Sequence, residues 1–95
     1  MERELLEIVL ANPDRFKEVR SRVSPGEFGS ERFRRIYQLC LELSTDGSAP
    51  ELNSLRMHVD EPDLATFLSA LAIAGERKGN VDRRLEDVLA AFERR

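Results

Sequence analysis

The residue types that carry out chemistry are few in this sequence, and none has a suitable neighbour. His58 is the only histidine, so a histidine pair for zinc cannot form. Cys40 is the only cysteine, which excludes an internal disulfide and a cysteine-based zinc site. No serine has a histidine that the sequence would place beside it as a base. The sequence therefore predicts a non-enzymatic domain with no catalytic residue, no cofactor and no metal ion.

Two groups of residues resemble ligand sites but have simpler explanations. Asp60, Glu61 and Asp63 place three carboxylates within four positions, as many as a magnesium site could use. All three lie where a helix is expected to begin, and the helix dipole and free backbone amides stabilise acidic groups there, so we interpret them as helix caps. The stretch "GERKGN" is not a phosphate loop, because no lysine and hydroxyl follow Gly79 and no strand precedes Gly75.

Composition places the chain among ordinary globular proteins. Of its 95 residues, 41% are hydrophobic and 35% are charged, and the net charge is −3. Such a composition is neither disordered nor fibrous. A negative net charge supplies no basic field that would hold a polyanion independently of sequence. The single cysteine and the lack of a secretory signal lead us to expect a cytoplasmic protein that does not bind membranes.

Apolar residues recur at intervals of three and four along the whole chain, a pattern that predicts helices only. We expect an all-α, compact bundle of about six helices. They are one over residues 2–11, one that Asn12 caps and Pro13 opens, one over 31–45, a short one opened by Pro50, one begun by Asp60, and one from Val81 onward. The stretch "SPGEF" predicts a capping box on a short turn. The last helix is still amphipathic at Arg95, so we expect residues 1–95 to be a single helical domain excised from a larger protein, with that helix continuing.

The expected fifth helix contains "LATFLSALAIA", residues 64–74, without one charge. Eleven residues are too few to span a membrane, which takes about 20. On a helical wheel Leu64, Phe67, Leu68 and Leu71 share one face, and small residues lie opposite. We interpret this segment as the central helix of the bundle. A face centred on Ile73 and covered by a partner protein is the alternative.

The stretch "SPGEFGSERFRR" has the form of a turn that leads into a DNA-recognition helix with arginines at its start. The outer face of that helix also carries Glu31 and Glu42, so a phosphate backbone would meet carboxylates as well as guanidiniums. Glu31 and Arg35 are expected to form an i,i+4 surface pair. We therefore do not expect direct nucleic-acid binding.

Basic and acidic residues alternate around the last helix and the turn before it. Mixed charge of this kind suits a reversible protein contact whose partner is chosen by electrostatic complementarity. We predict a partner-binding face whose residues are Arg77, Arg83, Arg84, Asp87 and Arg94.

Five stretches taken in order resemble the helicase-binding domain at the C-terminus of bacterial DNA primase (DnaG). They are "ERELLEIVLANPDRF", "SPGEF", "RRIYQLCLELSTDG", "LATFLSALAIA" and "NVDRRLEDVLAAF". The first three also resemble the N-terminal domain of the replicative helicase (DnaB), and the two families share this helical fold. Two features favour the primase. Residues 52–71 run directly from one helix into the next, where the helicase family tends to insert a glycine-containing loop, and "RRLEDVLAAFERR" resembles the helix that leads to the primase docking hairpin.

The resemblance to primase implies a bundle that helps dock a primase, a nucleotidyltransferase, on the replicative helicase during DNA replication, and that is monomeric alone. The resemblance to the helicase implies instead its self-associating N-terminal domain. A third hypothesis is that the chain is a small helical DNA-binding module. No family binding residue can be carried onto this chain, because the docking hairpin is absent from it.

Overall fold

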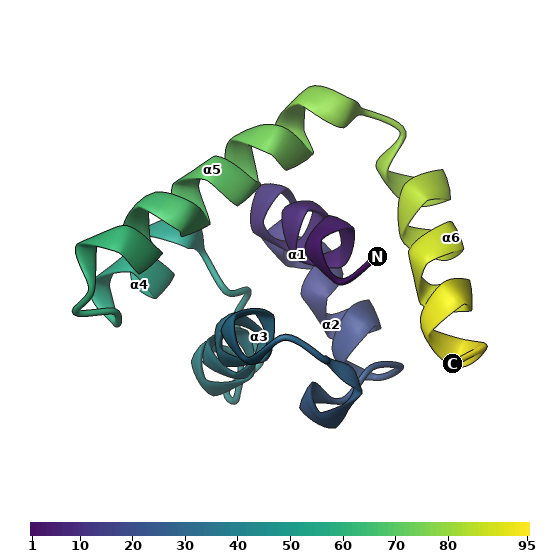
Figure 1. Cartoon of the computed structure of the whole chain (residues 1–95), viewed down its shortest axis with the longest axis horizontal. Helices are drawn as coiled ribbons and strands as arrows, with labels where there is room; N and C mark the ends of the chain where they lie inside the picture. The colour runs from purple at the N-terminus through teal and green to yellow at the C-terminus, as the bar shows by residue number, and fades with distance from the viewer.

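Helix α1 (Glu2–Ala11) lies at the centre of the structure, a computed structural model that describes all 95 residues (Figure 1). Residues 5 to 10 are buried without exception. Helices α3 (Glu31–Leu43), α5 (Pro62–Lys78) and α6 (Val81–Glu93) all contact α1. Because neighbours surround it, α1 shows no exposed stripe in its middle.

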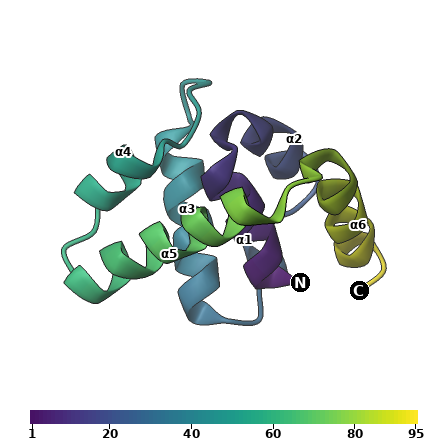
Figure 2. The same ribbon diagram turned by 90° about the horizontal axis from the view of Figure 1, so that it is seen from above.

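The prediction of an all-α bundle of six helices is confirmed, and no strand is present. Figure 2 shows the helices from above, with α4 beside α5 and α6 at the opposite end of the molecule. No helix has the length and apolar content needed to cross a membrane. The remaining elements are short, with bounds η1 Pro13–Arg15, α2 Phe16–Arg20, η2 Pro25–Glu27 and α4 Leu52–Met57.

One cluster of 22 buried apolar residues forms the core. Aromatic rings connect its distant segments, since the ring of Phe28 in the turn after η2 lies 4.8 Å from that of Tyr37 and 5.5 Å from that of Phe92, centroid to centroid. The Tyr37 hydroxyl donates a hydrogen bond to the carbonyl oxygen of Val23. These contacts join the segment between α2 and α3 to helices α3 and α6.

The prediction that the charge-free helix is central was wrong, because α1 takes that place. Helix α5 buries one side against α1, including Leu64, Leu68 and Leu71. Its opposite side is open, and the Ile73 side chain is 50% exposed. A charge-free sequence arises here because α5 has a buried side and a second, uncharged side that faces outward.

Gly75 sets how closely α5 approaches α1. A Cβ at this position would lie 2.8 Å from the carbonyl carbon of Glu7 and 2.9 Å from the Cβ of Ala11. Atoms at those distances overlap, so only a glycine allows the two helix backbones to meet here.

A buried carboxylate reinforces the same contact. Glu7 has a side chain only 3% exposed, and it accepts hydrogen bonds from Arg3 Nε at 3.0 Å and Lys78 Nζ at 2.6 Å. Burial acts to raise the pKa of Glu7, but the bonds from Lys78 and Arg3 outweigh it and hold that pKa below its usual value. The pair with Lys78 joins the end of α5 to the middle of α1.

Several local predictions were wrong because a competing partner was available. Asn12 does not cap the following helix, since its side-chain amide donates back to the Ile8 carbonyl oxygen of α1. Arg35 pairs with Glu61 rather than with Glu31. Helix α5 begins at Pro62, with Glu61 directly before it and Asp63 in its first turn, so the predicted place of these two residues at a helix start is confirmed, but no side chain caps the helix. The capping box between Ser24 and Glu27 is confirmed.

Substitution of Gly75 by alanine should destabilise the fold. We expect Gly75→Ala to lower the free energy of unfolding by about 1–3 kcal/mol, because α1 and α5 must separate to admit the methyl group. Gly26→Ala is the matched control, since a Cβ there meets nothing within 4 Å. It should change stability by less than about 1 kcal/mol. Urea unfolding followed by circular dichroism measures both, and equal effects of the two substitutions would contradict this account.

The Glu7 carboxylate should make stability depend on pH. Its pKa is lower in the folded than in the unfolded protein, so its stabilisation is present above the unfolded value of about 4.3 and is lost as pH falls through the folded value. We expect Glu7→Gln to cost roughly 1–2 kcal/mol at pH 7, a figure reduced because Arg3 and Lys78 are half exposed. In urea titrations the difference between the two proteins should shrink below about pH 4. A difference that stays constant with pH would be inconsistent with ion pairing.

Candidate interaction surfaces

The potentially reactive side chains of the chain lie apart from one another. Burial raises the pKa of the Cys40 thiol to about 12, so this thiol stays protonated at neutral pH. His58 lies exposed at the end of α4, with Nδ1 2.8 Å from the Ser54 carbonyl oxygen. No three residues among the histidine, cysteine and carboxylates gather as metal ligands would.

Helix α6 is fixed to the rest of the molecule by an apolar face and by ion pairs. Leu85, Val88, Leu89 and Phe92 point into the core. Ion pairs flank them on both sides and connect α6 and the end of the chain to α1, η1 and the segment after α2. The pairs are Arg15–Asp82, Arg22–Glu86, Arg22–Glu93, Arg84–Glu4 and Arg95–Glu2.

The structure separates one of the five predicted partner-binding residues from the others. Arg84 points inward, with its side chain 15% exposed, and its Nε donates to Glu4 Oε1 at 3.1 Å. Its Nη1 donates to the Gly79 carbonyl oxygen at 3.3 Å. The guanidinium of Arg84 is therefore used inside the domain. The other four predicted residues are exposed and take part in no ion pair, and their partner-binding role stays a prediction: Arg77, Arg83, Asp87 and Arg94.

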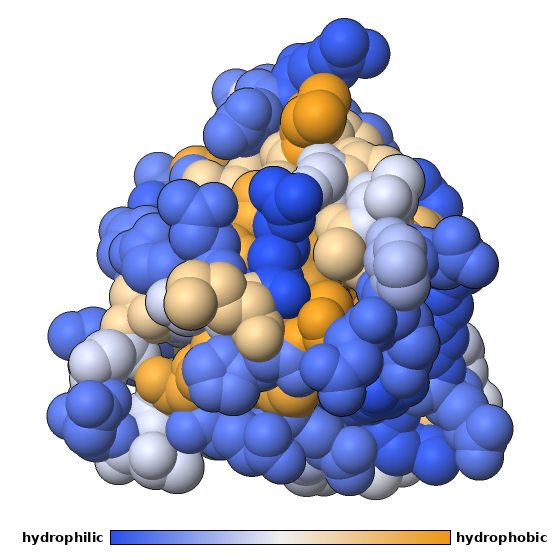
Figure 3. All heavy atoms as spheres, turned by 90° about the vertical axis from the view of Figure 1, so that its left-hand side faces the viewer, coloured by the Kyte–Doolittle hydropathy of each residue, from blue (hydrophilic) through white to orange (hydrophobic).

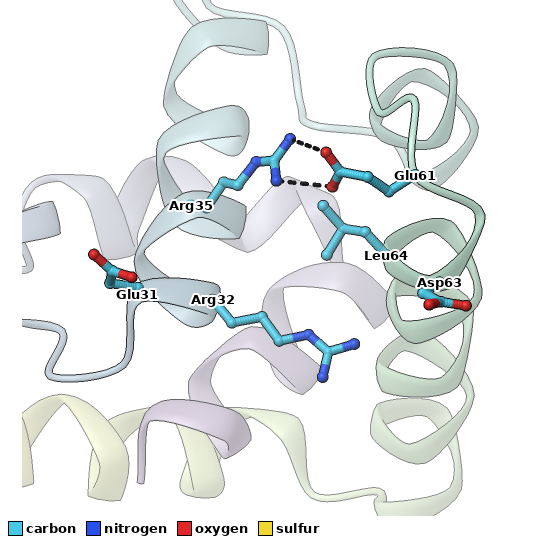
Figure 4. A pocket seen from close by; sticks show the side chains of 6 residues that line it. All are labelled: Glu31, Arg32, Arg35, Glu61, Asp63 and Leu64. Carbon is cyan, nitrogen blue, oxygen red and sulfur yellow. Dashed lines mark hydrogen bonds and ion pairs between the residues drawn. The ribbon is translucent and has the colours of Figure 1, made fainter.

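An open cleft of about 600 Å³ lies between the start of α3 and the start of α5 (Figure 4). Within it Arg35 forms two hydrogen bonds with Glu61, at 2.8 and 2.9 Å. The Arg32 side chain extends toward α5, with its guanidinium carbon 3.7 Å from the centre of the Phe67 ring. The residues that line the cleft are Glu31, Arg32, Arg35, Glu61, Asp63 and Leu64. Acidic groups outnumber basic groups here, so the cleft does not suit an anion.

The start of α3 does not present the free arginine cluster of a recognition helix. Arg35 is neutralised by Glu61, and Arg34 is half-buried and donates to the Phe28 carbonyl oxygen at 2.7 Å. Arg32 lies against an aromatic ring. Side chains engaged in this way would have to leave their partners before they contacted a phosphate backbone.

Apolar side chains are exposed on α4 and α5. Met57 is 84% exposed and Ile73 50%. A second cleft, of about 490 Å³, lies between these helices and is lined by Asn53, Arg56, Met57 and Ala65. Figure 3 shows orange and pale orange atoms on this side of the molecule, divided by blue polar side chains. Exposed apolar groups interspersed with charges are typical of surfaces that contact other proteins reversibly.

The fold and these surfaces define a small helical domain suited to protein interaction. The model of the DnaB-like helicase N terminal domain family matches residues 1–88, and the chain belongs to this family. No curated protein and no solved structure matches the chain. The DnaB N-terminal domain is a non-catalytic, protein-interaction domain of the helicase replication machinery. The match confirms the helicase resemblance and does not show the primase identity.

Sequence reasoning missed the contacts that cross between α3 and α5. Arg35 and Glu61 lie 26 positions apart, and no local pattern connects them. The contact of Arg32 with Phe67 has the same origin, since only the packed fold brings these two helices together. The one available signal was that Arg32 and Arg35 lie near the start of one helix and Glu61 directly before another.

Arg84 and Arg83 provide a comparison between an internal and an external arginine. We expect Arg84→Ala to lower the free energy of unfolding by roughly 1–2 kcal/mol, because Glu4 and the Gly79 carbonyl lose their donor. Arg83→Ala should have an effect within about 0.5 kcal/mol, since Arg83 is exposed and unpaired. Thermal unfolding of the two variants measures the difference. Equal stability of both variants would contradict the internal role of Arg84.

Proposed function

We propose that this chain is the self-associating N-terminal domain of a DnaB-type replicative helicase and acts in DNA replication by contact, not by chemistry. The observation that carries the proposal is the family match over residues 1–88, which spans α1 to α5 and most of α6. A domain with this role needs a rigid body and surfaces that a second protein can cover.

The surface of the domain supports this role. Ile73 and Met57 are exposed apolar side chains on neighbouring helices. Arg83, Asp87 and Arg94 lie exposed along α6 without ion pairs. Apolar groups supply the free energy of association, and unpaired charges select the partner and its orientation.

A primase tail that docks on the helicase is the second candidate, and one observation favours it. The link between α4 and α5 is four residues long, 58–61, and contains no glycine. The resemblance noted above associates a direct connection of this kind with the primase family. The two candidates differ in what the isolated domain binds, because a helicase domain binds itself and a primase tail binds the helicase.

Sedimentation equilibrium of the purified chain tests the proposal. We expect the average mass to rise toward that of two or more chains as concentration increases through the micromolar range, because association follows mass action. A chain that stays monomeric across this range, yet co-sediments with a purified replicative helicase, would overturn the helicase assignment and favour the primase tail.

A further inference from the structure

The outward side of α5 carries a row of residues that no other element covers. These residues recur at alternating intervals of three and four, the spacing of a seam between two packed helices. All are exposed, while the buried side of α5 faces α1. Figure 1 shows α5 along the edge of the molecule with α1 on its inner side, and Figure 2, seen from above, shows α5 on the side nearest the viewer. We name this set the α5 row: Asp63, Thr66, Ala70, Ile73 and Arg77.

The charges of the α5 row stand only at its ends. Asp63 lies in the first turn of α5 and Arg77 in the last, and neither takes part in an ion pair within the molecule. Between them the row is uncharged and includes the half-exposed Ile73. An uncharged middle with one unpaired charge of each sign at its ends is incomplete in a monomer, because the ends lack partners and Ile73 faces water.

We propose that the α5 row is a homodimer interface, in which α5 of one copy packs antiparallel to α5 of a second copy about a two-fold axis at Ala70. Asp63 precedes Ala70 by seven residues and Arg77 follows it by seven. Reversal of the second helix therefore places each Asp63 opposite an Arg77, about 10 Å from the axis on either side. The inference rests on the self-association proposed above and names the surface that carries it.

The side chains near the axis fit a close crossing. Ala70 meets its own copy at the two-fold axis, and its small side chain allows the helices to approach to about 8 Å. Ile73 of each copy falls between Thr66 and Ala70 of the other and covers its exposed half. Each contact then occurs twice, as a two-fold interface requires.

Charge decides both the orientation and the occupant. A parallel arrangement would place Asp63 opposite Asp63 and Arg77 opposite Arg77, which is unfavourable at both ends. In the antiparallel arrangement both ends attract, and the two helix dipoles also oppose each other. The charge pattern of the row is thus complementary to the same row read in the opposite direction. A second copy of the chain therefore supplies both of the missing charge partners. One pair of helices makes a small interface, so we expect dissociation in the micromolar range.

Charge reversal at the two ends tests the interface. In Asp63→Arg and in Arg77→Asp, like charges face each other at both ends of the row, because the symmetry doubles each change. We expect each variant to dimerise at least about tenfold more weakly than the original chain at low ionic strength. An equimolar mixture of the two variants should regain the original affinity as a heterodimer, since each copy then supplies the charge that the other lacks. Sedimentation equilibrium measures the dimer affinity of each variant and of their mixture.

Matched controls separate the interface from general charge effects and from loss of fold. Lys17→Asp and Glu18→Arg make charge reversals of the same kind on exposed residues of α2 that take part in no ion pair, and they should leave dimerisation unchanged. Circular dichroism reports whether each variant is folded. Recovery in the mixture also excludes unfolding, because two unfolded chains would not restore each other.

The position of the axis has a separate test. Ala70→Cys places two thiols face to face at the two-fold axis, so mild oxidation with copper phenanthroline should cross-link the dimer. Glu18→Cys, on the exposed side of α2, should not cross-link, and the buried Cys40 does not interfere.

The two levels of the proposal fail in different ways. A chain that dimerises with equal affinity when Asp63 or Arg77 is reversed would overturn the α5 interface and leave self-association in place through another surface. A chain that is monomeric throughout the micromolar range would overturn both.

Discussion

The close contact between α1 and α5 is the constraint on which the rest of the structure depends. It exists because Gly75 has no side chain where the backbone of Glu7 passes. With the two backbones in contact, α1 is enclosed on that side, and its polar Glu7 must take its partners from Arg3 and from Lys78 near the end of α5. Close packing and the buried ion pair are therefore two consequences of one crossing. If the helices packed closely without these partners, Glu7 would be a buried unpaired charge, which is unfavourable.

Helix α6 is attached by a different balance of interactions. Its apolar side chains are buried in the core, whereas most of its ion pairs lie at the surface, where water and salt screen them. The apolar face supplies the attachment, and the pairs fix the register of α6 against α1, η1 and the segment after α2. This division explains why Arg84 is unavailable to a partner although its neighbour Arg83 is free. Adjacent residues of a helix point in directions about 100° apart, so Arg84 faces the interior of the domain while Arg83 faces solvent.

Sequence predicts the elements well and the pairings between them poorly. The capping box of Ser24 and Glu27 is local, so three positions of sequence contain the whole interaction. The pair of Arg35 with Glu61 depends on how α3 lies against α5, and its predicted alternative with Glu31 was equally reasonable on one helix. The same limit explains the error over the central helix. An uncharged segment indicates only that charge is unfavourable along it. Burial on all sides would produce such a segment, and so does burial against α1 on one side combined with an uncharged outer face on the other. Gly75 was the available signal, since a glycine near the end of a long helix often marks a close approach.

That ambiguity has a functional side. A helix that is polar along its outer face needs no further cover once its inner face is buried, but the middle of α5, residues 64–74, is uncharged on both faces. Within the α5 row only Asp63 and Arg77 are charged, and they have opposite signs at equal distances from Ala70, while the exposed Glu76 lies beside the row at one end. Solubility of the monomer requires no such symmetry, because charges anywhere along the helix would serve equally well. A two-fold contact does require it, since each end of one helix meets the opposite end of the other. The arrangement of charge on α5 is therefore better explained by what covers the helix than by what lies beneath it.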